Sequence, residues 1–133
     1  MGTRSRIAII KKDGSIRSIY CHWDGYLEHN GVILLNYYDT EEKVNKLIDL
    51  GALSSLERTL DGTVSYHKWR GEELRVEEFK NIAEFFDYMY YSWEEYAYIF
   101  KDNEWYVSID DLEDYDCYHT RLLKKELSEK GMI

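Results

Sequence analysis

An α+β fold is predicted for this chain: an antiparallel sheet of about four strands, built from two hairpins and packed with three to four helices. Two β-branched and aromatic runs flank an Asp-Gly pair near the N-terminus, and two more aromatic runs flank a polar turn near residue 102. Apolar residues at helical spacing occupy other segments. The 133 residues, 44% of them apolar, suffice for one core, so a single domain over residues 1–133 is expected.

The first hairpin is expected over residues 6–23. Isoleucine-rich runs lie on both sides of Asp13-Gly14, a residue pair preferred in the two-residue type I′ turn. With that turn, Ile7 would lie opposite Tyr20 in the antiparallel pair.

Two helices are expected to cover one face of the sheet. The first spans residues 41–50 and begins with a capping box, in which Asp39 is the N-cap and Glu42 the third helical residue. The second spans residues 76–93 and is expected to be the longest helix. Its apolar positions include Phe86, which is therefore expected in the core.

The remaining segments carry weaker patterns. Residues 27–38 are expected to form another helix, residues 96–109 the second hairpin, and residues 120–130 a terminal helix. Residues 52–75 show no clear period, which is typical of a loop or a functional edge.

The negative charge is concentrated in the second half of the chain. Residues 1–60 hold 8 basic and 8 acidic side chains, whereas residues 72–116 hold 3 basic and 15 acidic ones, interleaved with 7 tyrosines. Such a surface repels phosphate backbones, so direct nucleic-acid binding is not expected. The first residues, which include Arg4 and Arg6, should form an opposite, basic pole.

The chain is expected to be cytoplasmic, with no membrane contact. No apolar run approaches the roughly 20 residues of a membrane span, and residues 1–6 lack the apolar region of a secretory signal. Cys21 and Cys117 are far apart in a chain large enough to fold without disulfides, so free thiols are expected.

The first candidate site is the run Tyr20-Cys21-His22-Trp23-Asp24-Gly25-Tyr26. Aromatic rings around His22 could form a stacking wall, and Asp24 could orient an imidazole or accept a ribose hydroxyl. The alternative is a strand end whose aromatics belong to the core and whose Asp24 caps the next turn.

The second candidate site is His67-x-x-Arg70. An arginine offers a bidentate fork for a phosphate or carboxylate, and a histidine three residues away would lie beside it on a helix. The alternative is a surface cluster of solvated charges. We expect His22 and Asp24 to converge with His67 and Arg70 in one pocket.

Metal binding is a minority interpretation, and no cofactor is expected. The chain has two cysteines, and His22 and His119 follow them closely in sequence, but it has no Cys-x-x-Cys pair. On a strand, Cys21 and His22 would point to opposite faces. Phosphate-binding glycine loops and nucleophile motifs are also missing from the sequence.

Residues 1–7 and 18–26 resemble a group of uncharacterised short phage and prophage proteins, which open Met-Gly-Thr-Arg-Ser-Arg-Ile and carry Ser-Ile-Tyr-Cys-His-Trp-Asp-Gly-Tyr. The resemblance covers roughly the first 75 residues, except that Leu27 stands where the group would have proline. It implies a phage origin and, by analogy with other small phage accessory proteins, an action against host immunity.

Three functions fit these features. The first is a non-enzymatic binder, or sponge, of a nucleotide-like phosphorylated ligand in host defence signalling, with homo-oligomerisation left open. Its ligand-binding set would be Arg4, Arg6, His22, Trp23, Asp24, Tyr26, His67 and Arg70. The second is an acidic inhibitor that mimics nucleic acid and docks on a host defence, CRISPR or restriction protein. The third is a metal-independent phosphodiesterase that uses His22 and His67 as base and acid, with Arg70 stabilising developing charge. Binding ranks above catalysis because the sequence contains no established catalytic motif.

Overall fold

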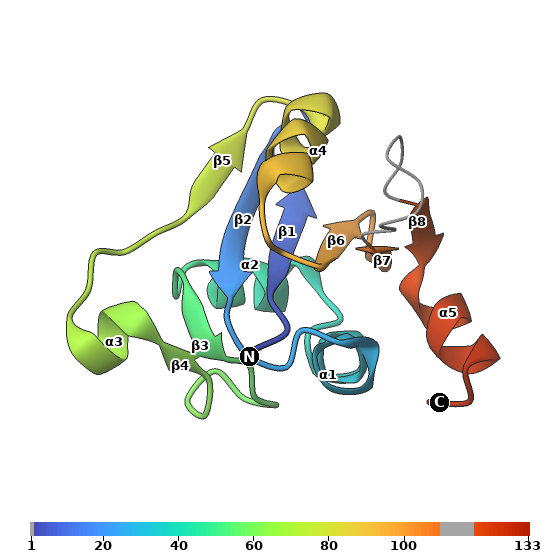
Figure 1. Cartoon of the computed structure of the whole chain (residues 1–133), viewed down its shortest axis with the longest axis horizontal. Coiled ribbons are helices and arrows are strands. Elements are labelled where there is room, and N and C mark those ends of the chain that lie inside the picture. The colour runs from blue at the N-terminus through green and yellow to red at the C-terminus, as the bar shows by residue number, and fades with distance from the viewer. Residues whose placement is uncertain (1, 110–118) are drawn as a thin grey trace.

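The computed structural model describes residues 2–109 and 119–133, which form one sheet of eight strands and the helices around it (Figure 1). The strands are β1 Ser5–Ile10, β2 Ile16–Cys21, β3 Leu53–Ser55, β4 Val64–Ser65, β5 Glu77–Phe79, β6 Tyr96–Lys101, β7 Glu104–Ile109 and β8 His119–Leu122. The helices are the π-helix η1 Leu27–Gly31, α1 Val32–Tyr37, α2 Glu41–Ile48, α3 Tyr66–Arg70, α4 Ile82–Tyr91 and α5 Leu123–Glu129.

The α+β class is confirmed, but the antiparallel sheet of about four strands is wrong. The sheet is mixed, in the order β4-β3-β2-β1-β6-β7-β8, and β5 pairs with the free part of the β2 edge. Both expected hairpins are present, and they join through a parallel pairing of β1 with β6; β2 and β3 are also parallel. The additional strands are only two to four residues long, too short to leave a periodic pattern in the sequence.

The first hairpin differs from its predicted register by one residue. Ile7 lies opposite Ile19, because the loop has three residues instead of two: the Lys11 amide bonds to the Ser15 carbonyl, and Gly14 takes a left-handed φ of 89°. The shift exchanges the faces of β2 relative to β1, since side chains alternate along a strand.

Two helix boundaries and the segment 52–75 also differ from the prediction. Thr40, not Asp39, caps α2, by accepting a hydrogen bond from the Lys43 amide. Residues 77–79 leave the expected long helix and form β5, so α4 starts only after the Asn81 cap. Within the segment 52–75, where a loop or functional edge is predicted, the structure contains β3, β4 and α3.

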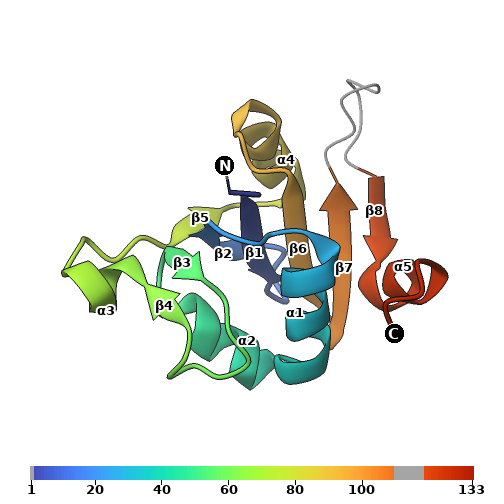
Figure 2. The ribbon, with the colours of Figure 1, turned by 60° about the horizontal axis from the view of Figure 1, so that its bottom comes forward.

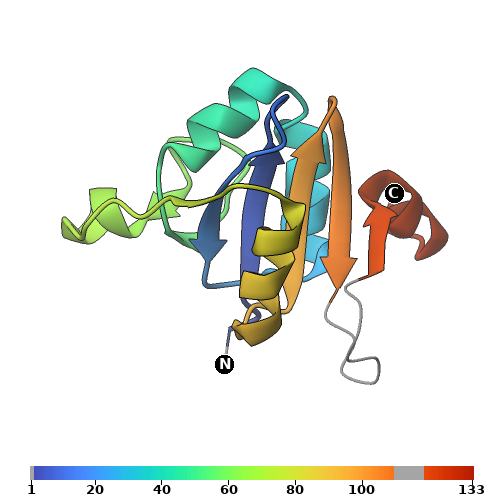
Figure 3. The ribbon, with the colours of Figure 1, turned by 90° about the horizontal axis from the view of Figure 1, so that it is seen from above.

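The helices cover both faces of the sheet, not one. Buried residues of η1, α1, α2 and α5 pack with Ile7 and Ile19 in the larger core, while α4 packs on the opposite face with Ala8 and Ile16 (Figure 3). At the two ends of the sheet, α3 and α5 lie far apart (Figure 2). None of the helices in the described ranges is long and apolar enough to span a bilayer.

Helix α4 places Phe85, not Phe86, in the core. Phe85 is fully buried and Phe86 only partly so. We expect Phe85→Ala to lower the free energy of unfolding by about 3–5 kcal/mol, since it removes a buried ring and leaves a cavity. Phe86→Ala should cost clearly less. Urea denaturation of the two variants checks this, and equal losses would contradict the placement of α4.

Candidate functional site

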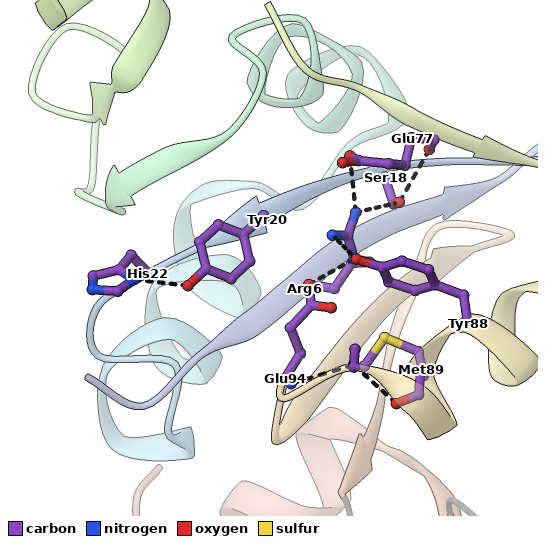
Figure 4. Close-up of polar contacts among 9 residues, drawn as sticks. Arg6, Ser18, Tyr20, His22, Glu77, Tyr88, Met89 and Glu94 are labelled. Atoms are coloured by element: carbon purple, nitrogen blue, oxygen red, sulfur yellow. Dashed lines mark hydrogen bonds and ion pairs between the residues drawn. The ribbon is translucent and has the colours of Figure 1, made fainter. Parts of the chain in front are cut away.

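A buried arginine lies at the centre of the face covered by α4. Arg6 of β1 is 1% exposed, and its guanidinium contacts four side chains (Figure 4). Nε donates to Glu94 at 2.7 Å, Nη1 donates to Glu77 and Ser18 at 3.1 Å each, and Nη2 donates to the Tyr88 hydroxyl at 2.8 Å. Burial alone would lower the pKa of Arg6, but the neighbouring Glu94 raises it above its ordinary value.

Arg6 therefore has a structural role. It is predicted as a phosphate ligand, but its nitrogen atoms are engaged by internal acceptors and the side chain has almost no exposed surface. In the observed register Arg6 lies opposite Tyr20 and on the same face as Ser18, whose hydroxyl also donates to the Glu77 carbonyl. Breaking the buried ion pair to bind a ligand would leave Glu94 buried without its partner.

The predicted site around His22 lies directly after the C-terminal end of β2. The Tyr20 hydroxyl and His22 Nδ1 are hydrogen-bonded at 2.7 Å, and the Trp23 ring meets the imidazole edge-on at 4.6 Å between centroids. Trp23 is 43% exposed. Asp24 has a left-handed φ of 57° and accepts a hydrogen bond from the half-buried Tyr26 at 3.0 Å. His22 and Trp23 are thus accessible, whereas Tyr26 and Asp24 are paired with each other.

The rest of this segment is part of the fold. The buried Asn30 of η1 donates to Ser5 Oγ at 3.2 Å and to Cys21 Sγ at 3.4 Å. The Tyr98 hydroxyl donates to the Gly25 carbonyl at 2.6 Å. A Cβ at Gly25 would lie 2.7 Å from Ser5 Cβ, so only glycine fits there. Cys21 and Gly25 therefore belong to the packed fold, whereas Trp23, which the strand-end interpretation assigns to the core, is exposed.

The second predicted site forms the exposed helix α3. His67 Nδ1 lies 2.7 Å from the Glu72 carbonyl oxygen, and the C-terminus of the helix is closed by Gly71 at a left-handed φ of 67°. The Arg70 guanidinium carbon lies 4.2 Å from the centre of the Trp69 ring and 5.4 Å from that of Tyr66. These stacking contacts hold Arg70 at the surface.

Backbone pairing brings the two candidate sites to the same end of the sheet. The His22 amide bonds to the Leu53 carbonyl, and the Tyr66 amide bonds to the neighbouring Ala52 carbonyl. One strand, β3, therefore separates them. Within the described ranges, however, no hydrogen bond, ion pair or ring contact joins His22 to Arg70 or to His67. Among the described residues, no direct contact therefore joins the two histidines that the phosphodiesterase hypothesis assigns as base and acid.

Three residues that make hydrogen bonds to buried side chains in this region were not predicted from the sequence. Glu94 and Tyr88 hold Arg6 from the α4 side, and Asn30 holds the strand end. Their sequence positions carry no signal, since an isolated glutamate, tyrosine or asparagine is usually exposed. Residues 110–118, which include Cys117, lie outside the described structure, as does the side chain of His119. Among the side chains that are described, no group of three or more His, Cys, Asp or Glu could hold a metal ion.

Comparison of the chain with protein-family models, with curated proteins and with solved structures finds no match.

The buried ion pair predicts a large stability effect. Arg6→Met should destabilise the protein by about 3–5 kcal/mol, because it leaves Glu94 buried and unpaired. The double variant Arg6→Met/Glu94→Gln should recover part of that loss. The matched control is Arg17→Met, whose partner Asp49 is exposed, with an expected cost below about 1 kcal/mol. Equal unfolding free energies for Arg6→Met and Arg17→Met would show that the pair is not buried in solution.

The buried thiol of Cys21 predicts a pH effect. Burial raises its pKa from 9.0 to about 11, so it stays protonated in the fold at pH values where the unfolded chain ionises. Stability should therefore fall as pH rises from about 9 toward 11, and less so in Cys21→Ala. In a Cys117→Ser background, iodoacetamide should modify Cys21 only under unfolding conditions. Fast modification of the native protein would contradict this.

Proposed function

We propose that the protein is a non-enzymatic binding protein whose α4 surface docks on a basic surface of another protein. The α4 surface consists of four exposed aromatic residues and three exposed acidic ones on α4 and the turn after it. They are Tyr88, Tyr90, Tyr91, Trp93, Glu84, Asp87 and Glu95.

The exposure of the aromatic residues carries the proposal. Tyr91 is 77% exposed, Trp93 83% and Tyr90 53%. Isolated apolar side chains on a surface need no explanation, but a cluster of large rings marks interaction sites. Tyrosine and tryptophan are also the residues that contribute most to binding energy in protein interfaces.

The packing of α4 explains why these rings point outward. The helix rests on the sheet through Phe85 and Met89, one turn apart, which leaves the other positions to solvent. After the helix, the burial alternates: Glu94 turns inward to Arg6, so Trp93 and Glu95 on either side turn outward. The hydrogen bond from Arg6 to Tyr88 anchors the helix further. A fixed surface loses little conformational entropy on binding.

The charge of the α4 surface selects the partner. Lys80 is the only basic residue between residues 80 and 95, against the acidic Glu84, Asp87 and Glu95 at the surface. Aromatic rings also attract cations, arginine in particular. The complementary partner is a protein with arginines and lysines on its surface, such as one that binds nucleic acid. The resemblance to phage proteins supports a host protein as this partner.

A site-specific cross-linking experiment tests the proposal. A photo-reactive phenylalanine analogue replaces Tyr91 or, as a control, Tyr37, which is also exposed but lies on α1. In the cells in which the protein acts, position 91 should give one discrete adduct with a basic protein, and position 37 should not give it. Glu84→Lys/Asp87→Lys should abolish the adduct, and Trp93→Ala should weaken binding to the identified protein at least tenfold.

Three outcomes would contradict this proposal. They are the absence of an adduct at position 91, an adduct with a second copy of this chain, and a partner affinity that stays unchanged in the charge-reversal variant. The far-ultraviolet circular dichroism spectrum of each variant is compared with that of the unmodified protein, to show that the variant is folded.

A further inference from the structure

A second surface lies where β2 and β4 end and β3 begins. Its floor contains Tyr20 and His22, joined by the 2.7 Å hydrogen bond, and Tyr66, which β3 holds beside them. These are half-buried rings whose outer surfaces remain accessible.

Arg70 lies on one side of these rings, and its guanidinium makes one long ion pair among the described residues. Its ion pair with Glu72 is 3.7 Å long, beyond hydrogen-bonding distance, and no hydrogen bond from its guanidinium is present among the described residues. The guanidinium carbon lies over the Trp69 and Tyr66 rings, at 4.2 and 5.4 Å from their centres. An exposed arginine held beside aromatic rings is suited to bidentate binding of a phosphate.

Arg4 borders the floor near Tyr20. Ser5 pairs with Cys21, so the preceding Arg4 lies beside His22 where the two strands end. The positive charge of Arg4 also opposes the rise in the pKa of Tyr20 that burial causes. Within the described ranges no ion pair or side-chain hydrogen bond holds Arg4; its carbonyl oxygen accepts the Glu95 amide at 2.9 Å. Arg4, unlike the predicted ligand Arg6, keeps its guanidinium free for a ligand.

We infer that the surface bounded by Arg4, His22, Tyr66 and Arg70 binds a nucleotide. The two arginines would hold its phosphates, while the accessible rings, with Trp69 at 57% and Trp23 at 43% exposure, offer faces for the base. The ligand must carry both groups. A free phosphate would miss the stacking contacts, and a nucleoside would miss both arginines.

The nucleotide surface and the α4 surface use different side chains, although they adjoin where the Glu95 amide bonds to the Arg4 carbonyl. The docking residues Tyr91 and Trp93 belong to α4 and the turn after it, whereas Tyr66 and Arg70 belong to α3. Trp93→Ala should therefore leave nucleotide binding unchanged, so that each proposal can fail while the other holds.

Calorimetric titration of the full chain tests the inference. The probes are ATP, cyclic di-AMP, cyclic di-GMP, adenosine and tripolyphosphate. At least one of the three nucleotides should bind, and adenosine and tripolyphosphate should each bind at least tenfold more weakly. No binding by any nucleotide at about 1 mM would overturn the inference. Equal affinity for tripolyphosphate would overturn it too, because it would indicate charge attraction alone.

Substitutions locate the site with the nucleotide that binds best. Arg70→Lys should weaken binding at least tenfold, because it keeps the charge but removes the bidentate fork. Arg4→Ala and His22→Ala should each weaken binding, and the loss in His22→Ala/Arg70→Ala should be smaller than the product of the single losses, since residues on one ligand couple. The matched control is Arg58→Lys: Arg58 is also stacked on a tyrosine, Tyr37, at 5.7 Å. If Arg58→Lys and Arg70→Lys lose the same affinity, the inference is wrong.

Discussion

The ion pair between Arg6 and Glu94 joins most of the elements on one face of the sheet. The guanidinium starts on β1, reaches Ser18 on β2 and Glu77 on β5, and bonds to Tyr88 on α4 and to Glu94 just before β6. A buried charge must keep all of its partners, because the loss of one leaves a desolvated ion. The position of α4 over the sheet, and of the chain that leaves it, is thus set by polar geometry as well as by the Phe85 and Met89 contacts.

A single extra loop residue separates the predicted hairpin from the observed one, and it changes the interpretation of the site. Asp13-Gly14 predicts a turn correctly, but the sequence contains nothing that distinguishes a two-residue loop from the three-residue loop closed between Lys11 and Ser15. With the observed register, Arg6 and Tyr20 share a face. The sequence therefore points to candidate residues, whose role in binding stays a prediction, but it could not show that Arg6 is buried while Arg4 is only partly buried.

Local patterns predicted long elements and missed what depends on tertiary contact. The hairpins and helix α2 carry strong periodic signals, whereas β3, β4 and β5 exist because a neighbouring edge offers hydrogen bonds. In the segment 76–93, both Phe85 and Phe86 fit a helical stripe, and the choice between them depends on where the helix starts. Pairing of β5 with β2 delays that start to Ile82 and thereby selects Phe85 for the core.

The two proposed surfaces follow from the same partition of charge. Arg6 is neutralised internally, so the cations left for a ligand are Arg4 and Arg70, near the strand ends. The inward turn of Glu94 removes one acid from the surface but exposes Trp93 beside the acidic Glu95. The acidic α4 surface repels a phosphate, and the two arginines attract it. A basic protein is attracted by the α4 surface and repelled by the two arginines. The two proposed surfaces thus suit ligands of opposite charge, and its buried ion pair keeps Arg6 from contributing to either surface.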